Sequence, residues 1–289
     1  MGVDFFFVLS GMLMSKILFE KNTPLNIFYK RRISRIFPVF FIYLSTISIW
    51  SAAFNLSNEH KNFFYNLFFL RTYFPENPGP WSSGLPLEHL WSLNVEEHSY
   101  IFLSTLVILP FSRSKIIFFI LLTGLSSILL KYLYFRLPDL APPHFSLRTE
   151  TSFSFILLST GYYLIHKKVD RFVPSWAPAV SVCLAILCYT PYSPHWTASW
   201  TLTPIFLTFS ISHLGKSPAP LLNILKLTSL RMIGVWSFSI YLWQQPLIPL
   251  KNTFPFAGGI LAALSIIIGI ISFYGIEDPA RKYLNKKWQ

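Results

Sequence analysis

Nine apolar runs follow one another along the chain with short connections between them, and this pattern limits the fold more than any other feature. A helix needs about 20 apolar residues to cross roughly 30 Å of hydrocarbon. The runs lack the alternation of polar and apolar residues that is typical of a membrane β-barrel. We therefore predict an all-α integral membrane protein, a single membrane-embedded domain over residues 1–289 with about nine transmembrane helices. The runs cover approximately 2–16, 36–54, 92–111, 116–134, 152–166, 176–190, 198–214, 233–250 and 256–274.

The composition excludes an ordinary soluble enzyme. Only 12% of the 289 residues are charged and 53% are hydrophobic, whereas a soluble domain carries about 25% charged residues. The high apolar content also excludes intrinsic disorder.

The net charge of +12 is explained by the predicted topology rather than by nucleic-acid binding. The Lys and Arg residues gather in alternate connections, and the connections between those are poor in both. Since basic connections face the cytoplasm, we predict a multi-pass membrane protein with a cytoplasmic C-terminus and an N-terminus outside. The basic segments are 30–35, 113–115, 167–171, 216–231 and 281–287.

The first run contains two polar residues, Asp4 and Ser10, in the segment Gly2–Gly11. A carboxylate inside a membrane is costly and is a candidate functional group for that reason. The alternative is an interfacial acid at a helix end.

A basic cluster precedes the second run. On a helix Arg31 and Arg35 share one face and Arg32 is adjacent to Arg35. Three guanidinium groups at the cytoplasmic side suit a phosphate-rich ligand. The alternative is an anchor to lipid headgroups.

The densest polar segment is Glu88–Tyr100. His89 and Glu96 lie near one helical face with Ser92 between them, and an imidazole or a carboxylate there suits a general base that acts on a hydroxyl. The alternative is an interfacial helix start with a Trp and Tyr belt.

A fourth segment, Trp236–Pro246, places hydroxyl, amide and aromatic side chains in a span next to a proline. This favours a cavity-lining helix. The remaining histidines, His166 and His213 among them, are isolated in the sequence. No spacing typical of a metal site occurs, so we expect no metal.

Together these segments resemble the acyltransferase 3 family of bacterial membrane O-acyltransferases, which modify O-antigen, peptidoglycan and exopolysaccharide. The matching segments are, in family order, Gly2–Gly11, Phe28–Pro38, His89–Tyr100, Ser237–Pro246 and Glu277–Arg281.

The resemblance implies an enzyme that moves an acyl group, usually acetyl, from cytoplasmic acetyl-CoA to a hydroxyl of a cell-surface glycan such as lipopolysaccharide O-antigen. It implies a location in the bacterial inner membrane and no permanently bound cofactor. The expected partners are membrane lipid and a glycan or lipid-linked glycan acceptor, with no nucleic acid. The implied donor-binding residues are Arg31, Arg32 and Arg35; the catalytic candidates are Glu96, His89 and Asp4; the cavity candidates are Ser10, Trp91, Ser92, Tyr241, Trp243 and Gln244.

Two departures from the family pattern bear on activity. The chain starts where the second family helix starts, so the first helix, with the His regarded as the base, is absent from this sequence. Gln244 also stands where the family has a second His, and an amide is no base near neutral pH. His89 and His98 are candidate substitutes. The alternative functions are an inactive truncated relative and a non-enzymatic transporter of a glycan intermediate.

Overall fold

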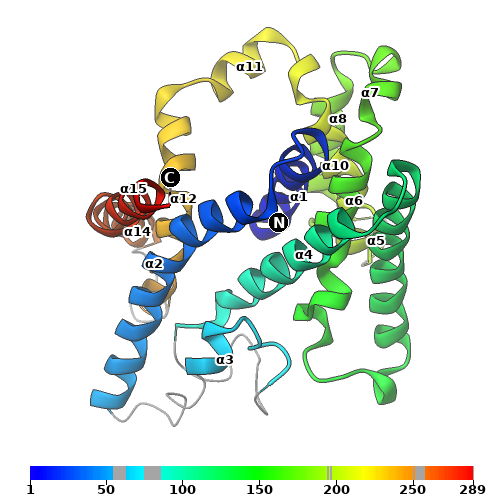
Figure 1. The fold of residues 1–289 in the computed structure, drawn as a ribbon. Coiled ribbons are helices and arrows are strands. Elements are labelled where there is room, and N and C mark those ends of the chain that lie inside the picture. The colour runs from blue at the N-terminus through cyan, green and yellow to red at the C-terminus, as the bar shows by residue number, and fades with distance from the viewer. Residues whose placement is uncertain are drawn as a thin grey trace. The chain divides into compact units, whose positions relative to one another are not determined.

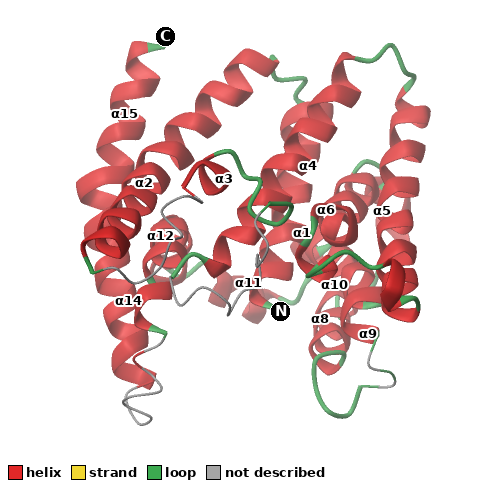
Figure 2. Cartoon of the chain, turned by 90° about the horizontal axis from the view of Figure 1, so that it is seen from below, coloured by secondary structure: helices red, strands yellow, loops and turns green. Residues whose placement is uncertain are grey.

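The computed structural model describes residues 1–54, 63–74, 86–193, 195, 197–248, 250 and 258–288. None of these residues lies in a strand, and helices account for most of them (Figures 1 and 2). The predicted all-α fold class is thus confirmed.

Each of the nine predicted apolar runs contains a helix. In chain order the elements are α1 (Gly2–Met14), η1 (Ser15–Glu20), α2 (Leu25–Ala53), α3 (Phe63–Leu67), η3 (Glu88–Leu90), α4 (Trp91–Ile108), α5 (Arg113–Arg136), η4 (Pro138–Leu140), η5 (Phe145–Leu147), α6 (Thr149–Tyr163), α7 (His166–Val169), η6 (Asp170–Phe172), α8 (Ala177–Leu187), α9 (Ala198–Thr201), α10 (Thr203–Ser212), η7 (Leu214–Lys216), α11 (Ala219–Leu225), α12 (Thr228–Trp243), η8 (Gln245–Leu247), α14 (Gly258–Ser272), η10 (Phe273–Glu277) and α15 (Asp278–Lys287). The segments η1 and η10 are π-helices and the other η segments are short 3₁₀-helices.

Fewer helices are long enough to cross a membrane unaided. Four meet the requirements of length and hydropathy among the described residues: Gly2–Glu20, Leu25–Ala53, Arg113–Arg136 and Gly258–Lys287. A fifth is added if His166–Phe172 and Ala177–Leu187, which meet at 110°, form one broken span. The predicted count of nine and the orientation therefore stay predictions.

Several helices begin where the sequence places a proline. Pro178, Pro204 and Pro279 occupy the first turns of α8, α10 and α15. Proline is favoured there because a first-turn N–H has no partner within the helix and the ring fixes a helical φ. At the start of α5 the Ser112 hydroxyl instead accepts a hydrogen bond from the Lys115 N–H, which is the usual role of an N-cap serine.

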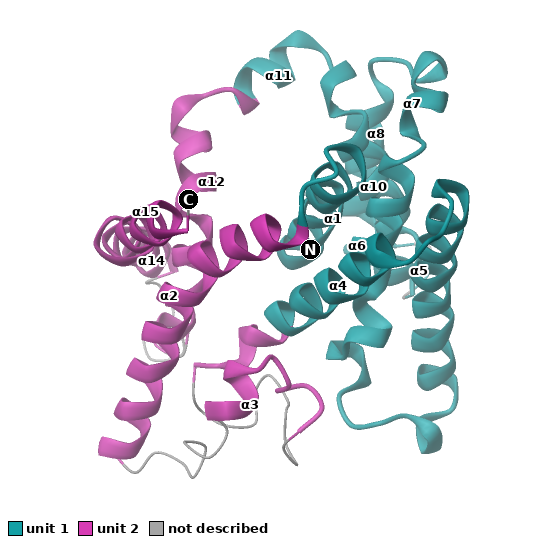
Figure 3. Cartoon of the chain, viewed as in Figure 1, with its two compact units in different colours: residues 1–24, 92–224 teal, residues 25–91, 225–289 magenta. Residues whose placement is uncertain are grey.

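The chain divides into two compact units, which are coloured separately in Figure 3. Unit 1 consists of Met1–Pro24 and Ser92–Ile224. At its centre α6 contacts α1, α5 and α10, and α10 also packs on α8. The buried face of α6 is rich in Ser and Thr. Small hydroxyl residues allow membrane helices to approach closely and to exchange hydrogen bonds.

Within unit 1, α1 closely approaches α6 at Gly11. A Cβ atom on this glycine would collide with the carbonyl oxygen of Ile156 and lie 3.0 Å from its carbonyl carbon. Around the crossing the Ser159 hydroxyl donates to the Val8 carbonyl at 2.6 Å, and the Thr160 hydroxyl donates to the Gly11 carbonyl at 3.0 Å. The contact is therefore backbone to backbone, with two hydroxyl groups fixing its register.

Unit 2 consists of Leu25–Trp91 and Leu225–Gln289. Here α12 packs on α14, and α15 and η10 pack along α2. Gly269 of α14 lies against the backbone of Ile240, where an added Cβ would meet the Ile240 Cα at 2.8 Å. This unit thus contains its own glycine-mediated helix crossing.

The Gly11 crossing yields a stability prediction. Gly11→Ala adds only a Cβ, yet it must push the α6 backbone away, so we expect a loss of at least about 2 kcal/mol in unfolding free energy. The measurement is thermal unfolding of the detergent-solubilised chain. Gly215→Ala is the control, because nothing lies within 4 Å of the added atom. Equal melting temperatures for the two variants would show that α1 does not pack closely on α6 at Gly11.

Candidate active site

Two hydroxyl groups converge on the buried carboxylate of Glu96 in unit 1. The Ser10 hydroxyl donates to Glu96 Oε1 at 2.7 Å, and the Tyr100 hydroxyl donates to the same oxygen. The Ser10 and Tyr100 hydroxyls also share a hydrogen bond. Glu96 is 3% exposed and Tyr100 is fully buried. The structure thus brings together two residues that the sequence analysis named, Ser10 and Glu96, and adds Tyr100.

Helix geometry explains this convergence. Tyr100 follows Glu96 by one turn of α4, so their side chains share a face. Ser10 comes from α1, whose position is set one residue later by the Gly11 crossing. A buried carboxylate is costly without hydrogen bonds. With them, Glu96 can accept a proton from a substrate hydroxyl or orient that hydroxyl.

Asp4 does not belong to this cluster. Its carboxylate accepts a hydrogen bond from the Tyr189 hydroxyl at 2.6 Å and pairs with the Met1 amino group at 2.8 Å. Asp4 precedes Ser10 by six residues, or about 9 Å along the helix axis, and points to another side of it.

In unit 2, aromatic side chains surround His89. The ring centroids of Tyr43 and Tyr241 lie 5.6 and 4.9 Å from the His89 ring, and Trp243 lies 5.1 Å from Tyr43. The Tyr241 hydroxyl donates to the His89 carbonyl and the Tyr43 hydroxyl donates to the Pro86 carbonyl. Side chains from α2 and α12 therefore hold the segment just before α4.

The amide that reaches this segment is Gln245. Its Nε2 donates to Glu88 Oε2 at 3.0 Å, and both side chains are buried. Gln244, the residue that the sequence analysis named, is the half-buried C-cap of α12. Successive residues at a helix end point about 100° apart, so only one of the two amides faces Glu88.

Arg71 is a functional candidate that the sequence analysis missed. Its side chain is only 1% exposed. Burial, and then the Arg71 charge, lower the pKa of His89 to about 3. His89 is therefore a neutral group and a weak base near pH 7. An arginine inside an apolar, aromatic stretch (FFLRTYF) on the predicted outer side was the signal that could have identified it.

The basic cluster lies on α2 as predicted from the spacing. Arg31 and Arg35 are exposed and Arg32 is half-buried. Beside them α15 is held by hydrogen bonds from the Ser34 hydroxyl to Asn285 Oδ1 at 3.0 Å and from Lys30 Nζ to the Trp288 carbonyl at 3.4 Å. Exposed guanidinium groups on one helical face remain able to bind phosphate.

The last two sequence segments meet at Glu277, the final residue of the π-helix η10. The Ser239 hydroxyl donates to Glu277 Oε2 at 2.7 Å, and the charges of Arg35 and Arg281 act on this carboxylate. Nearby, Trp243 Nε1 donates to the Ser272 hydroxyl at 2.9 Å. Glu277 is 1% exposed, so it links α12, α2 and the start of α15 from inside unit 2.

Trp91 and Ser92 open α4. Ser92 is buried and Trp91 is half-buried. Both therefore belong to the packed start of this helix.

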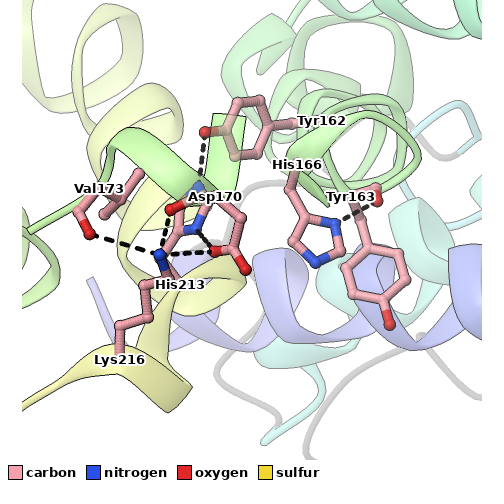
Figure 4. Close-up of polar contacts among 7 residues, drawn as sticks. All are labelled: Tyr162, Tyr163, His166, Asp170, Val173, His213 and Lys216. Carbon is pink, nitrogen blue, oxygen red and sulfur yellow. Dashed lines mark hydrogen bonds and ion pairs between the residues drawn. The ribbon is translucent and has the colours of Figure 1, made fainter. Parts of the chain in front are cut away.

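A second polar cluster in unit 1 joins His213 to residues far away in the sequence (Figure 4). His213 Nδ1 lies 2.9 Å from Asp170 Oδ1, and its Nε2 lies 2.8 Å from the Tyr162 hydroxyl. Lys216 Nζ lies 3.5 Å from the same Asp170 oxygen. Both nitrogens of the imidazole are thus hydrogen-bonded, whether the ring is neutral or protonated. His213 is isolated in the sequence, and its contacts could not be predicted there because its partners are distant along the chain.

His166 belongs to the same cluster. Its ring stacks on Tyr163 with centroids 4.6 Å apart and lies 5.9 Å from the His213 ring. The Tyr163 hydroxyl donates to Glu20 Oε2 at 3.2 Å, and Lys167 pairs with Glu20 Oε1 at 2.7 Å. These contacts tie the end of η1 to the end of α6. His166, also treated as isolated in the sequence, is therefore part of a packed helix end.

No group of three or more His, Cys, Asp or Glu side chains in the described part of the chain could hold a metal ion.

The environment of His89 gives a pH prediction. Between its folded pKa of about 3 and the ordinary 6.5, the unfolded chain binds a proton that the folded chain does not, so acid favours unfolding. From pH 7.5 to pH 5 this contribution is about 2 kcal/mol. His89→Gln should therefore lose about that much less stability than the wild type over this range. The measurement is unfolding in detergent at both pH values, with the exposed His144→Gln as control. The same pH dependence in His89→Gln and wild type would exclude this environment.

Comparison with known proteins shows which family the chain resembles. A family model described as "Acyltransferase domain" matches residues 1–276. Peptidoglycan O-acetyltransferase OatA of Listeria monocytogenes is 30% identical, over 97% of this chain and 51% of the relative. The putative peptidoglycan O-acetyltransferase YrhL of Bacillus subtilis is 26% identical, over 97% and 50%. A putative O-acetyltransferase of Staphylococcus aureus strain COL, SACOL0978, is 25% identical, over 98% and 52%.

The chain spans about half the length of these curated relatives. No solved structure matches it significantly. The match to the family model nevertheless extends over nearly the whole sequence and includes four of the five segments, ending one residue before the fifth, Glu277–Arg281. The chain therefore belongs to the acyltransferase 3 family.

Proposed function

We propose that the chain is the membrane domain of an O-acetyltransferase that acts on a cell-surface glycan. The observation that carries this proposal is the buried Ser10–Glu96–Tyr100 cluster, which lies inside a region that matches the acyltransferase family from residue 1 to residue 276. A membrane protein has little reason to keep a buried carboxylate unless it serves binding or chemistry.

The acceptor that the relatives favour is peptidoglycan. The OatA relative is named a peptidoglycan O-acetyltransferase and the YrhL relative a putative one. We propose a hydroxyl group of a peptidoglycan sugar as the acceptor, and lipopolysaccharide O-antigen in the inner membrane of a Gram-negative cell as the alternative. The two are distinguished by which surface polymer gains base-labile acetate when the gene is expressed.

The donor that we propose is acetyl-CoA from the cytoplasm. Arg31, Arg32 and Arg35 would bind its phosphates, since planar guanidinium groups bind phosphate oxygens in pairs. The positive-inside rule supports a cytoplasmic position for this cluster, and the thioester donor is made in that compartment.

The reaction is an acyl transfer. The acceptor oxygen forms a bond to the acyl carbon, the carbon–sulfur bond breaks, and the hydroxyl proton ends on the departing thiolate. We propose that Glu96 receives the proton or orients the hydroxyl that carries it. His89 is less suited to this role, because burial and the Arg71 charge lower its pKa to about 3.

The Glu96 role is tested by Glu96→Gln, which keeps the shape of the side chain and removes its basicity. We expect acetate transfer to fall by about 10²–10⁴-fold, while the amount of protein in the membrane is unchanged. The measurement is mass spectrometry of the glycan from cells that express each variant. Asp139→Asn, an exposed acid, is the control. Full transfer by Glu96→Gln at normal expression would remove the catalytic assignment.

The donor site is tested by the double variant Arg31→Ala, Arg32→Ala. Loss of two guanidinium groups should raise the KM for acetyl-CoA by at least about tenfold, since each charge-assisted hydrogen bond contributes about 1.5–3 kcal/mol. Lys168→Ala with Arg171→Ala removes the same charge from another predicted cytoplasmic segment and should leave that KM unchanged. If both double variants raise the KM for acetyl-CoA equally, the effect comes from net charge, and the arginine cluster of α2 is not the donor site.

A further inference from the structure

The ammonium group of Lys131 lies inside unit 1 without a close counter-ion. Lys131 belongs to α5, whose range Arg113–Arg136 is one of the candidate membrane spans, and its side chain is half-buried. Within the described ranges no carboxylate lies within 4 Å of its Nζ; the Asp4 carboxylate acts on it from farther away. A lysine within a candidate membrane span is a candidate functional residue.

Aromatic rings lie beside this ammonium group. Lys131 Nζ is 5.9 Å from the centroid of the Trp200 ring, and Tyr132 is 6.5 Å from the same ring. Trp200 is half-buried and Tyr132 is 40% exposed. Their surfaces are therefore partly available to a ligand.

Asp4 and Tyr189 complete the cluster. The Tyr189 hydroxyl donates to Asp4 at 2.6 Å, and the Met1 amino group pairs with the same carboxylate at 2.8 Å. Tyr189 is 36% exposed. The five side chains come from α1, α5, α9 and the segment just after α8, all within unit 1 (Figure 3). A cation, a carboxylate, a phenol and two aromatic surfaces therefore gather in one place.

This set of side chains differs from an ordinary aromatic belt. Belt residues need only Trp and Tyr at the membrane interface, and such a belt explains neither the ammonium group nor the carboxylate. Aromatic surfaces with a few polar groups are instead the usual composition of a small-molecule site. The cluster lies near the connections 135–151 and 191–197, which the charge distribution predicts to be outside.

We propose that Lys131, Trp200, Tyr132, Tyr189 and Asp4 form an acceptor subsite for a sugar residue that carries a carboxylate. The aromatic rings pack on the apolar face of the sugar ring, Lys131 pairs with the carboxylate, and Asp4 accepts a sugar hydroxyl. Asp4 then has a binding role rather than a catalytic one. The inference rests on the proposed function for the identity of the acceptor, and it adds the place and the charge of the sugar that is bound.

The test measures binding without turnover. The full chain in lipid nanodiscs is mixed with either of two disaccharides, and saturation-transfer NMR reports binding. One is N-acetylglucosaminyl-N-acetylmuramic acid, and the other is chitobiose, which lacks the lactyl carboxylate. We expect the first to bind at least about tenfold more tightly. Equal affinity for the two would overturn the proposal.

Three variants assign the contacts. Trp200→Ala should weaken the binding of both disaccharides, and Lys131→Gln should remove only the preference for the carboxylate, which Lys131→Arg should restore. Trp176→Ala removes an aromatic ring that is 60% exposed elsewhere in unit 1 and should change nothing. Unaltered binding by Trp200→Ala, or the same loss with Trp176→Ala, would place the sugar elsewhere.

The two proposals fail in different ways. If the chain binds the charged disaccharide through Lys131 and Trp200 but Glu96→Gln leaves glycan acetylation unchanged, the subsite stands and the catalytic proposal falls. If acetylation depends on Glu96 but Trp200→Ala leaves the KM for the acceptor unchanged, the subsite falls and the catalytic proposal stands.

Discussion

The absence of a side chain at Gly11 is the constraint on which the arrangement of unit 1 depends. Because this residue has no Cβ, α1 approaches the carbonyl of Ile156 on α6 at a distance that any other residue would prevent. Ser159 and Thr160 then reach carbonyls on α1. The neighbouring Ser10 is turned about 100° from Gly11 and so faces Glu96 of α4. Gly11 therefore packs against α6, and the preceding residue, Ser10, supplies a polar contact to α4.

Polar groups within the helices of unit 1 are satisfied mainly by hydroxyl groups. The buried face of α6 carries serines and threonines rather than charges, and the Glu96 carboxylate also accepts hydrogen bonds from two hydroxyls. Such bonds between membrane helices contribute about 0.6 kcal/mol each on average. Close packing therefore provides most of the stability, and the hydrogen bonds fix which residues face each other.

The sequence predicted the helices well and their partners poorly, for a physical reason. An apolar run or a local motif is a property of neighbouring residues, so the nine runs, the Arg31–Arg35 face and the polar character around Glu96 could all be identified. The pairs Gln245–Glu88, Ser239–Glu277 and His213–Asp170 join distant segments and leave no local pattern. Gln244 was named because it stands where the family has a His, and the motif does not show that the adjacent Gln245 is the amide that faces Glu88. The number of membrane spans could not be predicted either, because it depends on the length of each helix, and hydropathy alone does not give that length.

Both π-helices end on a glutamate that makes contacts: Glu20 closes η1 and Glu277 closes η10. A π turn holds one residue more than an α turn of the same hydrogen-bonded length. In the C-terminal helix, η10 thus sets the rotational phase between the apolar α14 before it and the polar α15 after it. In η10 the extra residue determines the direction in which Glu277 points and, through α15, the side on which Asn285 meets Ser34. The membrane-embedded half of this helix can keep the orientation that its packing against α12 requires, while the phase of the half that carries the charges is adjusted separately.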